Sequence, residues 1–223
     1  MGEEQRFHAM VQYQKTGLLR YLGHLDLAKA FDRAVRRARI PVKYTQGYSP
    51  RAQISFPPPL PVGVEGLAEL CAVELQEAAE ARDIYVALAP ELRSFRIAEV
   101  EVRRRARRSL WTELKAAGYQ AVPDFAEDVD EAVMQQAVAQ LLGADEIAVE
   151  RKTKRRTRCV NIRPHIYRLR AAGDMIDMVL GVTEETLVKP DEVLTALARA
   201  MGAQEDGGWR RLVRTGLHFG AAQ

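Results

Sequence analysis

The chain has 223 residues, with 33 Lys or Arg, 30 Asp or Glu, and a formal net charge of +3 when the histidines are neutral. Hydrophobic residues make up 47% and charged residues 28%, values typical of globular proteins that exclude wholesale disorder. The two cysteines exclude a disulfide scaffold and cannot supply the four thiolates of an iron–sulfur cluster, so we expect no cofactor in this chain. No apolar run approaches the roughly 20 residues of a membrane span. The first ten residues contain no apolar signal core, so we expect a cytoplasmic protein without membrane contact.

The first half of the chain predicts alternating strands and helices. Residues 7–14 alternate apolar and polar side chains, which indicates a strand. Residues 24–39 carry a single apolar stripe, which indicates a helix, and Pro41 ends it. Strands are expected at 53–56, 67–75 and 95–102, and a helix at 79–88. The resulting order, β-α-β-β-α-β, is typical of the ferredoxin-like arrangement, in which two helices cover one face of an antiparallel sheet and leave the other face open.

The second half repeats this order more loosely. It predicts a helix-like stretch around residues 110–114, helices at 129–142 and from Pro190, and strands at 119–122, 146–151, 160–169, 174–182 and 210–219. We therefore expect the α+β class, with two ferredoxin-like lobes in tandem at residues 1–105 and 106–223. The halves show no sequence identity, so this expectation depends on element order alone.

Positive charge is concentrated in three short segments. Their members are Arg33, Arg36, Arg37 and Arg39; Arg103, Arg104, Arg105, Arg107 and Arg108; and Arg151, Lys152, Lys154, Arg155, Arg156 and Arg158. Acidic residues gather elsewhere, at 74–80 and 124–131. Segregated charge creates local positive fields that attract polyanions. The alternative is a set of solvated faces balanced by nearby carboxylates; we favour a nucleic-acid or other anionic partner.

A turn-rich segment adds aromatic side chains to this charge. In residues 43–56, Tyr44 and Tyr48 can stack on bases, Gly47 permits positive φ, and Arg51 follows Pro50. The basic run 151–156 lies between two expected strands, where a hairpin loop would suit phosphate contacts. The expected nucleic-acid contacts are Arg33, Arg36, Arg37, Lys43, Tyr44, Tyr48, Arg51, Arg151, Lys152, Lys154, Arg155, Arg156 and Arg158. The alternatives are tyrosines that cover the edge of the core, and a solvated loop with no partner.

Signatures of catalysis are mostly absent. The chain has no Walker A loop, GxGxxG, GxSxG, HExxH or CxxC. His24 and Asp26, at the start of the first helix, are the candidate catalytic pair, with His24 contacting phosphate or acting as a general base. The alternative is a helix-start motif in which Asp26 is stabilised by the helix dipole. The spacing of the four histidines supports no metal site.

Several phrases, in this order, resemble a known family. They are residues 15–17 (KTG), 20–27 (RYLGHLDL), 33–38 (RAVRRA), 40–42 (IPV), 44–50 (YTQGYSP), 54–56 (ISF) and 60–63 (LPVG). This set is similar to the radical SAM-linked protein family, an uncharacterised bacterial domain (domain of unknown function 2344). Fainter agreement at residues 160–164, 190–194 and 214–217 extends the resemblance over almost the whole chain. Gly23 departs from relatives that carry Ser there, a better helix cap.

The resemblance implies an accessory to a radical SAM enzyme, because such domains are fused to that enzyme or encoded beside it. This chain has no CxxxCxxC motif, so radical SAM chemistry would have to come from a separate polypeptide. The leading hypothesis is an RNA-binding, non-catalytic partner of such an enzyme in RNA modification. One alternative is a metal-independent RNA endonuclease that uses His24 as base. Another is a protein–protein adaptor that docks through residues 57–62, without nucleic acid.

Overall fold

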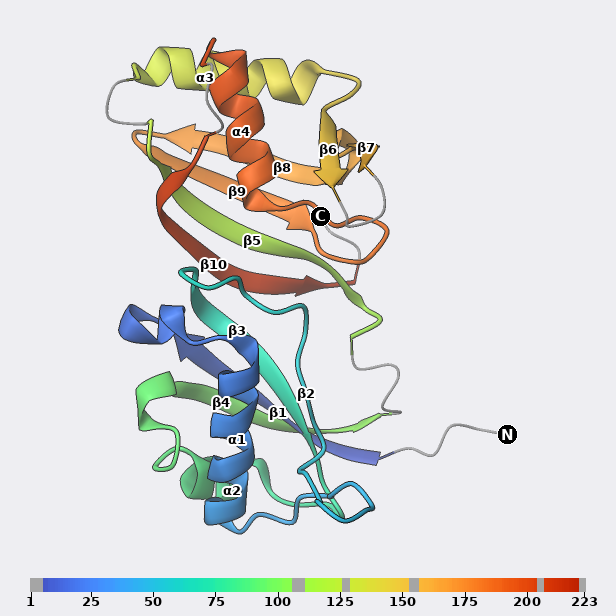
Figure 1. Cartoon of the computed structure of the whole chain (residues 1–223). Helices are drawn as coiled ribbons and strands as arrows, with labels where there is room; N and C mark the ends of the chain where they lie inside the picture. The colour runs from blue at the N-terminus through green and yellow to red at the C-terminus, as the bar shows by residue number, and fades with distance from the viewer. Residues whose placement is uncertain (1–5, 106–110, 126–128, 153–156, 204–206, 221–223) are drawn as a thin grey trace. The chain divides into compact units, whose positions relative to one another are not determined.

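The computed structural model describes residues 6–105, 111–125, 129–152, 157–203 and 207–220. Within these ranges the protein is mixed α+β, with mostly antiparallel sheets and four α-helices, so the expected class is confirmed. The chain divides into two compact units, Met1–Glu113 (unit 1) and Leu114–Gln223 (unit 2), which Figure 1 draws in one colour ramp. The boundary expected at 105/106 adjoins residues 106–110, outside the described ranges. That boundary and the tandem ferredoxin-like arrangement stay predictions.

Unit 1 has the order of strands and helices that its sequence predicts. Its elements are β1 (Arg6–Lys15), α1 (His24–Ala38), β2 (Ile54–Ser55), β3 (Glu65–Glu74), α2 (Ala81–Leu88) and β4 (Ile97–Arg105), with short 3₁₀ helices η1 (Gly17–Tyr21) and η2 (Arg93–Phe95). The sheet runs β4-β1-β3, and β2 pairs with β3. All of these pairings are antiparallel.

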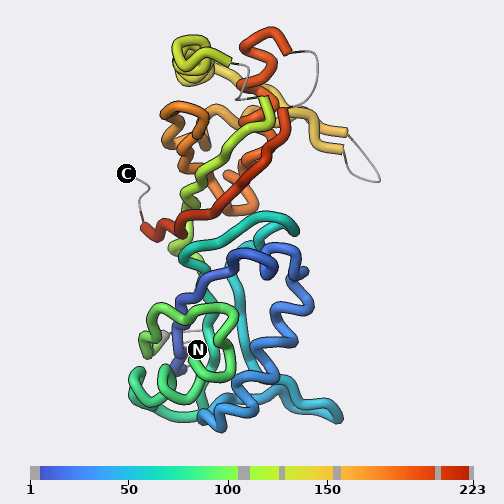
Figure 2. The backbone as a smooth tube through the Cα atoms, turned by 90° about the vertical axis from the view of Figure 1, so that its left-hand side faces the viewer, coloured from blue at the N-terminus to red at the C-terminus, as the bar shows by residue number. Residues whose placement is uncertain are grey.

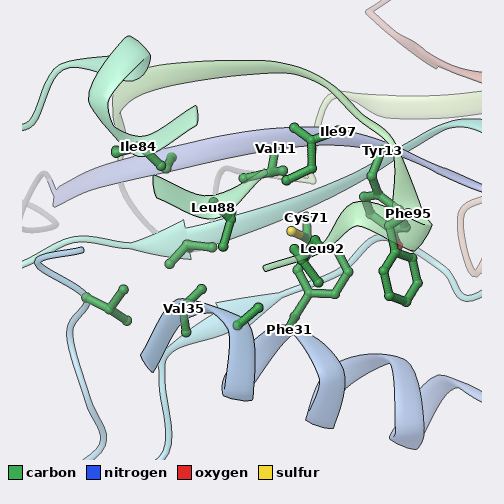
Figure 3. Packing of buried hydrophobic residues seen from close by; sticks show 14 of the residues in the cluster. Val11, Tyr13, Phe31, Val35, Cys71, Ile84, Leu88, Leu92, Phe95 and Ile97 are labelled. Atoms are coloured by element: carbon green, nitrogen blue, oxygen red, sulfur yellow. The ribbon is translucent and has the colours of Figure 1, made fainter. Parts of the chain in front are cut away.

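The hydrophobic core of unit 1 joins one face of this sheet to α1 and α2 (Figure 3). Val11 and Tyr13 of β1 share that face because alternate strand residues point the same way. The Phe31 ring from α1 lies 4.8 Å from the Tyr13 ring and 5.4 Å from the Phe95 ring. The apolar stripe expected on the first helix is confirmed, since Leu27, Phe31, Ala34 and Val35 are buried. This stripe fixes which face of α1 points outward.

The opposite face of the unit 1 sheet is not open at its centre, contrary to the expectation from sequence. Met10 on β1 and Ala72 on β3 are paired across the ladder, and both are buried with Trp111 packed against them. A tryptophan covers a large apolar area, so Trp111 shields the centre of this face from solvent. Trp111 is also not helical: residues 111–113 form a turn and β5 begins at Leu114. The nucleic-acid surface therefore has to be sought outside the centre of this face.

Unit 2 contains a four-stranded sheet and a separate hairpin. Its elements are β5 (Leu114–Pro123), α3 (Glu131–Gly143), β6 (Ala148–Lys152), β7 (Thr157–Asn161), η5 (Arg163–His165), β8 (Ile166–Ala172), β9 (Met175–Gly181), α4 (Pro190–Ala200) and β10 (Trp209–Phe219). The sheet runs β10-β5-β9-β8, while β6 and β7 pair only with each other. Helix α3 packs against β8 and α4, and Figure 2 shows the β6–β7 hairpin projecting from the rest of unit 2.

The single strand expected at residues 160–169 is wrong, because the chain turns there. β7 ends at Asn161, and the 3₁₀ helix η5 separates it from β8. Asn161 Oδ1 accepts hydrogen bonds from the backbone N–H groups of Ile147 and Arg163, each at 3.0 Å. The Arg163 guanidinium donates to the Leu142 carbonyl at 2.6 Å near the end of α3. These two side chains thus join the hairpin, α3 and the start of β8.

Candidate nucleic-acid interface

The segment from Tyr44 to Ala52, which we call the 44–52 loop, is a closed hairpin turn. Tyr44 and Ala52 form an antiparallel bridge at its base. The Thr45 N–H donates to the Arg51 carbonyl at 2.9 Å, and the Arg51 N–H donates to Thr45 Oγ1 at 3.0 Å. Gly47 has a φ of 132°, a backbone conformation that residues other than glycine rarely adopt. The sequence signals for a turn at this position are confirmed.

Asp32 on α1 fixes this loop to the helix. Its Oδ1 accepts from the Ala52 N–H at 3.0 Å, and its Oδ2 accepts from Arg36 Nε at 2.9 Å. Arg36 then donates to the Pro50 carbonyl at 2.6 Å. Burial alone would raise the pKa of Asp32, but the hydrogen bonds from Arg36 and Ala52 and the charges of Arg36 and Arg51 hold it below its usual value. The carboxylate therefore stays charged and holds the loop in one place.

The two tyrosines of the loop have different environments. The Arg36 guanidinium lies over the Tyr44 ring, 5.0 Å from its centroid, and Tyr44 is half-buried. Tyr48 is fully exposed, with a relative accessibility of 105%. Because Tyr44 is half-buried beneath Arg36 while Tyr48 is fully exposed, Tyr48 offers the larger ring surface to a base. The prediction that both tyrosines stack on bases stays untested.

The outward face of α1 carries the basic side chains. Leu25, Lys29, Arg33 and Arg36 follow one another at spacings of four, four and three residues, which places them on one side of a helix. Lys29 forms an ion pair with Asp26 at 3.2 Å in which both side chains are exposed, and such pairs contribute little to the stability of the fold. Arg33 makes no ion pair with any residue that the structure describes. We call Lys29, Arg33, Arg51 and Tyr48 the α1 basic surface.

Two other predicted phosphate contacts near α1 already have carboxylate partners. Arg37 pairs with Glu91. Lys43 lies 3.1 Å from Glu74 Oε1, which also accepts from Arg6 at 2.7 Å. Burial alone would raise the pKa of Glu74, but the hydrogen bonds and charges of Lys43 and Arg6 hold it below its usual value. Arg37 and Lys43 thus have structural partners, and an anion would have to compete with a carboxylate for each.

The basic cluster of unit 2 is similarly mixed. Arg151 on β6 makes two hydrogen bonds of 2.8 Å to the Glu192 carboxylate and one of 2.6 Å to the Leu187 carbonyl, which ties β6 to the start of α4. The hydrogen bonds that Arg151 donates to Glu192 raise the pKa of Arg151 above its usual value. Lys152 and Arg158 are exposed on the hairpin strands. The predicted contacts Lys154, Arg155 and Arg156 lie outside the described residues.

The candidate catalytic residues lie at the exposed start of α1. The His24 ring meets the Phe56 ring edge-on, 5.4 Å between centroids. The Asp26 carboxylate bonds Lys29 and not His24. Gly23 precedes the helix without a side-chain cap. The described residues thus give His24 no carboxylate partner to act with, and they contain no group of three metal-ligating side chains.

The described elements define a mixed α+β protein with mostly antiparallel sheets and an exposed basic helix face in unit 1. Among the helices that the structure describes, none is both long enough and apolar enough to span a membrane. The chain belongs to the family described as "Uncharacterized protein conserved in bacteria (DUF2344)", whose model matches residues 8–190. Among curated proteins, none matches this chain.

The chain is similar to several solved structures at low sequence identity. A chain of a "Cbf5-Nop10-Gar1 Complex" is 14% identical over 93% of this chain and 48% of its own, with a TM-score of 0.51. A chain of the "archaeal box H/ACA sRNP Nop10-Cbf5 complex" is 13% identical over 95% and 48%, with a TM-score of 0.49. An "Unknown Protein from Galdieria sulphuraria" is 15% identical over 89% and 93%, with a TM-score of 0.26. Our chain spans about half the length of the first two.

Proposed function

We propose that this protein binds RNA through the α1 basic surface, as an accessory to a radical SAM enzyme carried on a separate chain. One observation carries the RNA part of this proposal. The outward face of α1 and the loop attached to it present exposed cations together with a fully exposed aromatic ring, namely Lys29, Arg33, Arg51 and Tyr48. Cations that neutralise phosphates supply affinity, and an exposed aromatic ring supplies a stacking surface for a base.

The rigidity of this surface supports the proposal. α1 is anchored by its buried stripe, and the 44–52 loop is anchored to α1 through Asp32. Side chains held on fixed elements lose little conformational freedom when they bind, so more of the contact energy appears as affinity. The likeness to solved structures concerns the fold alone, and the proposal does not depend on it.

The radical SAM partner is supported by the family resemblance of the sequence. The two cysteines of this chain lie 88 positions apart, at Cys71, which is buried, and Cys159, which is exposed. This spacing gives no binding motif for an iron–sulfur cluster. If the resemblance carries over, the chemistry belongs to the partner and this chain supplies the RNA contact.

A salt series tests the RNA part. Binding of a labelled RNA should weaken steeply with salt, since each neutralised phosphate adds about 0.9 to the slope of log K against log salt for a duplex and about 0.7 for a single strand. Replacing Arg33 and Arg51 together by Ala should flatten that slope. The matched control removes the same charge elsewhere, as Arg82→Ala with Arg170→Ala, and should leave the slope nearly unchanged. An affinity independent of salt would contradict the proposal.

Co-purification tests the accessory part. Native protein isolated gently should bring an iron–sulfur protein with it, identified by mass spectrometry, and bound RNA, identified by sequencing. Intact RNA after incubation with the purified protein is expected. Cleavage that is lost in His24→Ala would instead favour the endonuclease alternative, and a partner recovered without RNA would favour the adaptor.

A further inference from the structure

A second exposed aromatic residue lies at the other end of α1. Tyr21 is the last residue of η1, is separated from α1 by two residues, and is 56% exposed. The Arg20 guanidinium lies 4.8 Å from the Tyr21 ring centroid and donates to the Tyr21 hydroxyl at 2.8 Å. Arg20 also lies 3.8 Å from Glu65, which ties this end of the surface to β3. Tyr21 is therefore held in place by a neighbour while much of it faces solvent.

The two exposed tyrosines belong to segments that adjoin different ends of α1. η1 precedes the first turn of α1, whereas the 44–52 loop contacts its later turns through Asp32 and Arg36 (Figure 1). A helix of 15 residues at 1.5 Å each is about 22 Å long. A stacked nucleic-acid strand rises about 3.4 Å per nucleotide, so this length corresponds to about six nucleotides.

The outward side chains of α1 combine positive charge with apolar surface. Lys29 and Arg33 offer charge, while Leu25 is 74% exposed on the same outward face. A duplex presents mainly phosphates to such a surface, because its bases are stacked on one another. An unpaired strand presents phosphates and the faces of its bases together. Exposed Tyr21, Leu25 and Tyr48 match the second kind of ligand and are not needed for the first.

We propose that the α1 basic surface selects single-stranded RNA, which lies along α1 for about six nucleotides with one unpaired base against Tyr21 and another against Tyr48. This inference rests on the proposed RNA-binding function and adds the class of RNA to it. Lys29 and Arg33 contact the phosphates between the two stacked bases.

The experiment compares one labelled 12-nucleotide single strand with its blunt duplex by fluorescence anisotropy at fixed salt. The single strand should bind at least about tenfold more tightly, and affinity should rise with strand length up to about six nucleotides before it levels off. Tyr21→Ala and Tyr48→Ala should each weaken single-strand binding roughly 5- to 150-fold and leave duplex binding unchanged. Tyr21→Phe and Tyr48→Phe should retain most of the affinity, because the ring remains.

A matched control is Tyr85→Ala on α2, a tyrosine that is 39% exposed outside this surface; it should bind both RNAs as the parent does. Equal affinity for duplex and single strand, with neither tyrosine variant weakened, would overturn the single-strand inference. If binding to both RNAs still weakened steeply with salt, the proposed RNA-binding function would be retained. Absence of salt-dependent binding to either RNA would instead overturn the proposed function. The two failures are thus distinguishable.

Discussion

Two arginines, Arg33 on α1 and Arg151 on the β6–β7 hairpin, lie in similar basic clusters of the sequence and differ in structure. On α1, Arg33 projects from an outward helix face and makes no ion pair with any described residue. On β6, the Arg151 side chain is only 17% exposed and is hydrogen-bonded to Glu192, which lies 41 positions further along the chain. Arginine density in a sequence therefore mixes cations that face solvent with cations that join structural elements, and distant carboxylates decide between the two.

The largest expected effect comes from removing the structural arginine. Arg151→Ala leaves the Glu192 carboxylate and the Leu187 carbonyl without their donor, and breaking such a charged network costs about 3 kcal/mol. Urea unfolding should show a lower midpoint for this variant. Arg158→Ala is the matched control, because Arg158 faces Arg151 across the ladder and is exposed; its unfolding free energy should change by less than about 0.5 kcal/mol. Equal losses in the two variants would erase the distinction between a structural arginine and a solvent-facing one.

The next effect concerns the carboxylate that organises the α1 basic surface. Asp32→Ala removes the acceptor for the Ala52 N–H and for Arg36, and we expect a loss of about 2 kcal/mol in unfolding free energy. Amide hydrogen exchange should show the Ala52 N–H losing protection before the core of unit 1 does. Asp26→Ala, on the same helix but in an exposed pair with Lys29, should cost about 0.5 kcal/mol or less. Unchanged protection at Ala52 would contradict the anchoring role.

A smaller effect depends on pH. The folded protein holds the pKa of Glu74 below its usual value, so its contribution to stability is present above the unfolded pKa of about 4.3 and is lost as pH falls through the folded pKa. Glu74→Gln should lower the unfolding free energy by about 1–2 kcal/mol at pH 7. The difference between parent and variant should shrink as pH falls below the unfolded pKa of about 4.3, because the unfolded parent then takes up a proton that the folded parent resists. Urea midpoints at pH 7 and pH 3.5 check this; a constant difference would contradict it.

The sequence predicted most elements of unit 1 because local patterns determine them. The spacing of Leu27, Phe31 and Val35 indicates which face of α1 is buried, whatever the rest of the chain does. The break at η5 was missed although Pro164 inside an expected strand was a signal for it. Local sequence patterns could not predict that Trp111 covers Met10, since this contact depends on where the chain returns after β4.

The site was predictable in residue type and not in arrangement. Tyr48 and Arg33 were singled out from composition, but Tyr21 was not, since a single tyrosine in a short 3₁₀ turn carries no pattern of its own. Asp32 was also missed, because its main partner Ala52 lies 20 residues away. One signal was available: an acid four residues before an arginine on a helix, as in Asp32 and Arg36, predicts a bonded pair.

The smallest effect separates two arginines on the same helix. Arg33 makes no ion pair within the described residues, whereas Arg37 is bonded to Glu91. If RNA contacts the α1 basic surface, Arg33→Ala should lower the salt slope of binding by about one phosphate contact. Arg37→Ala should leave the slope nearly unchanged and reduce the unfolding free energy by at most about 1 kcal/mol.

This comparison holds helix, residue type and charge change constant, so only the presence of a carboxylate partner differs between the two variants. Loss of Arg37 releases Glu91, whose negative charge then repels the RNA weakly, so any residual effect of Arg37→Ala should be a uniform, small decrease in affinity without a change in slope. The reverse result, with Arg37→Ala flattening the slope and Arg33→Ala leaving it intact, would mean that the RNA displaces Glu91 and lies on the α2 side of the helix. The salt slope of each variant therefore locates the strand on α1 as well as testing for it.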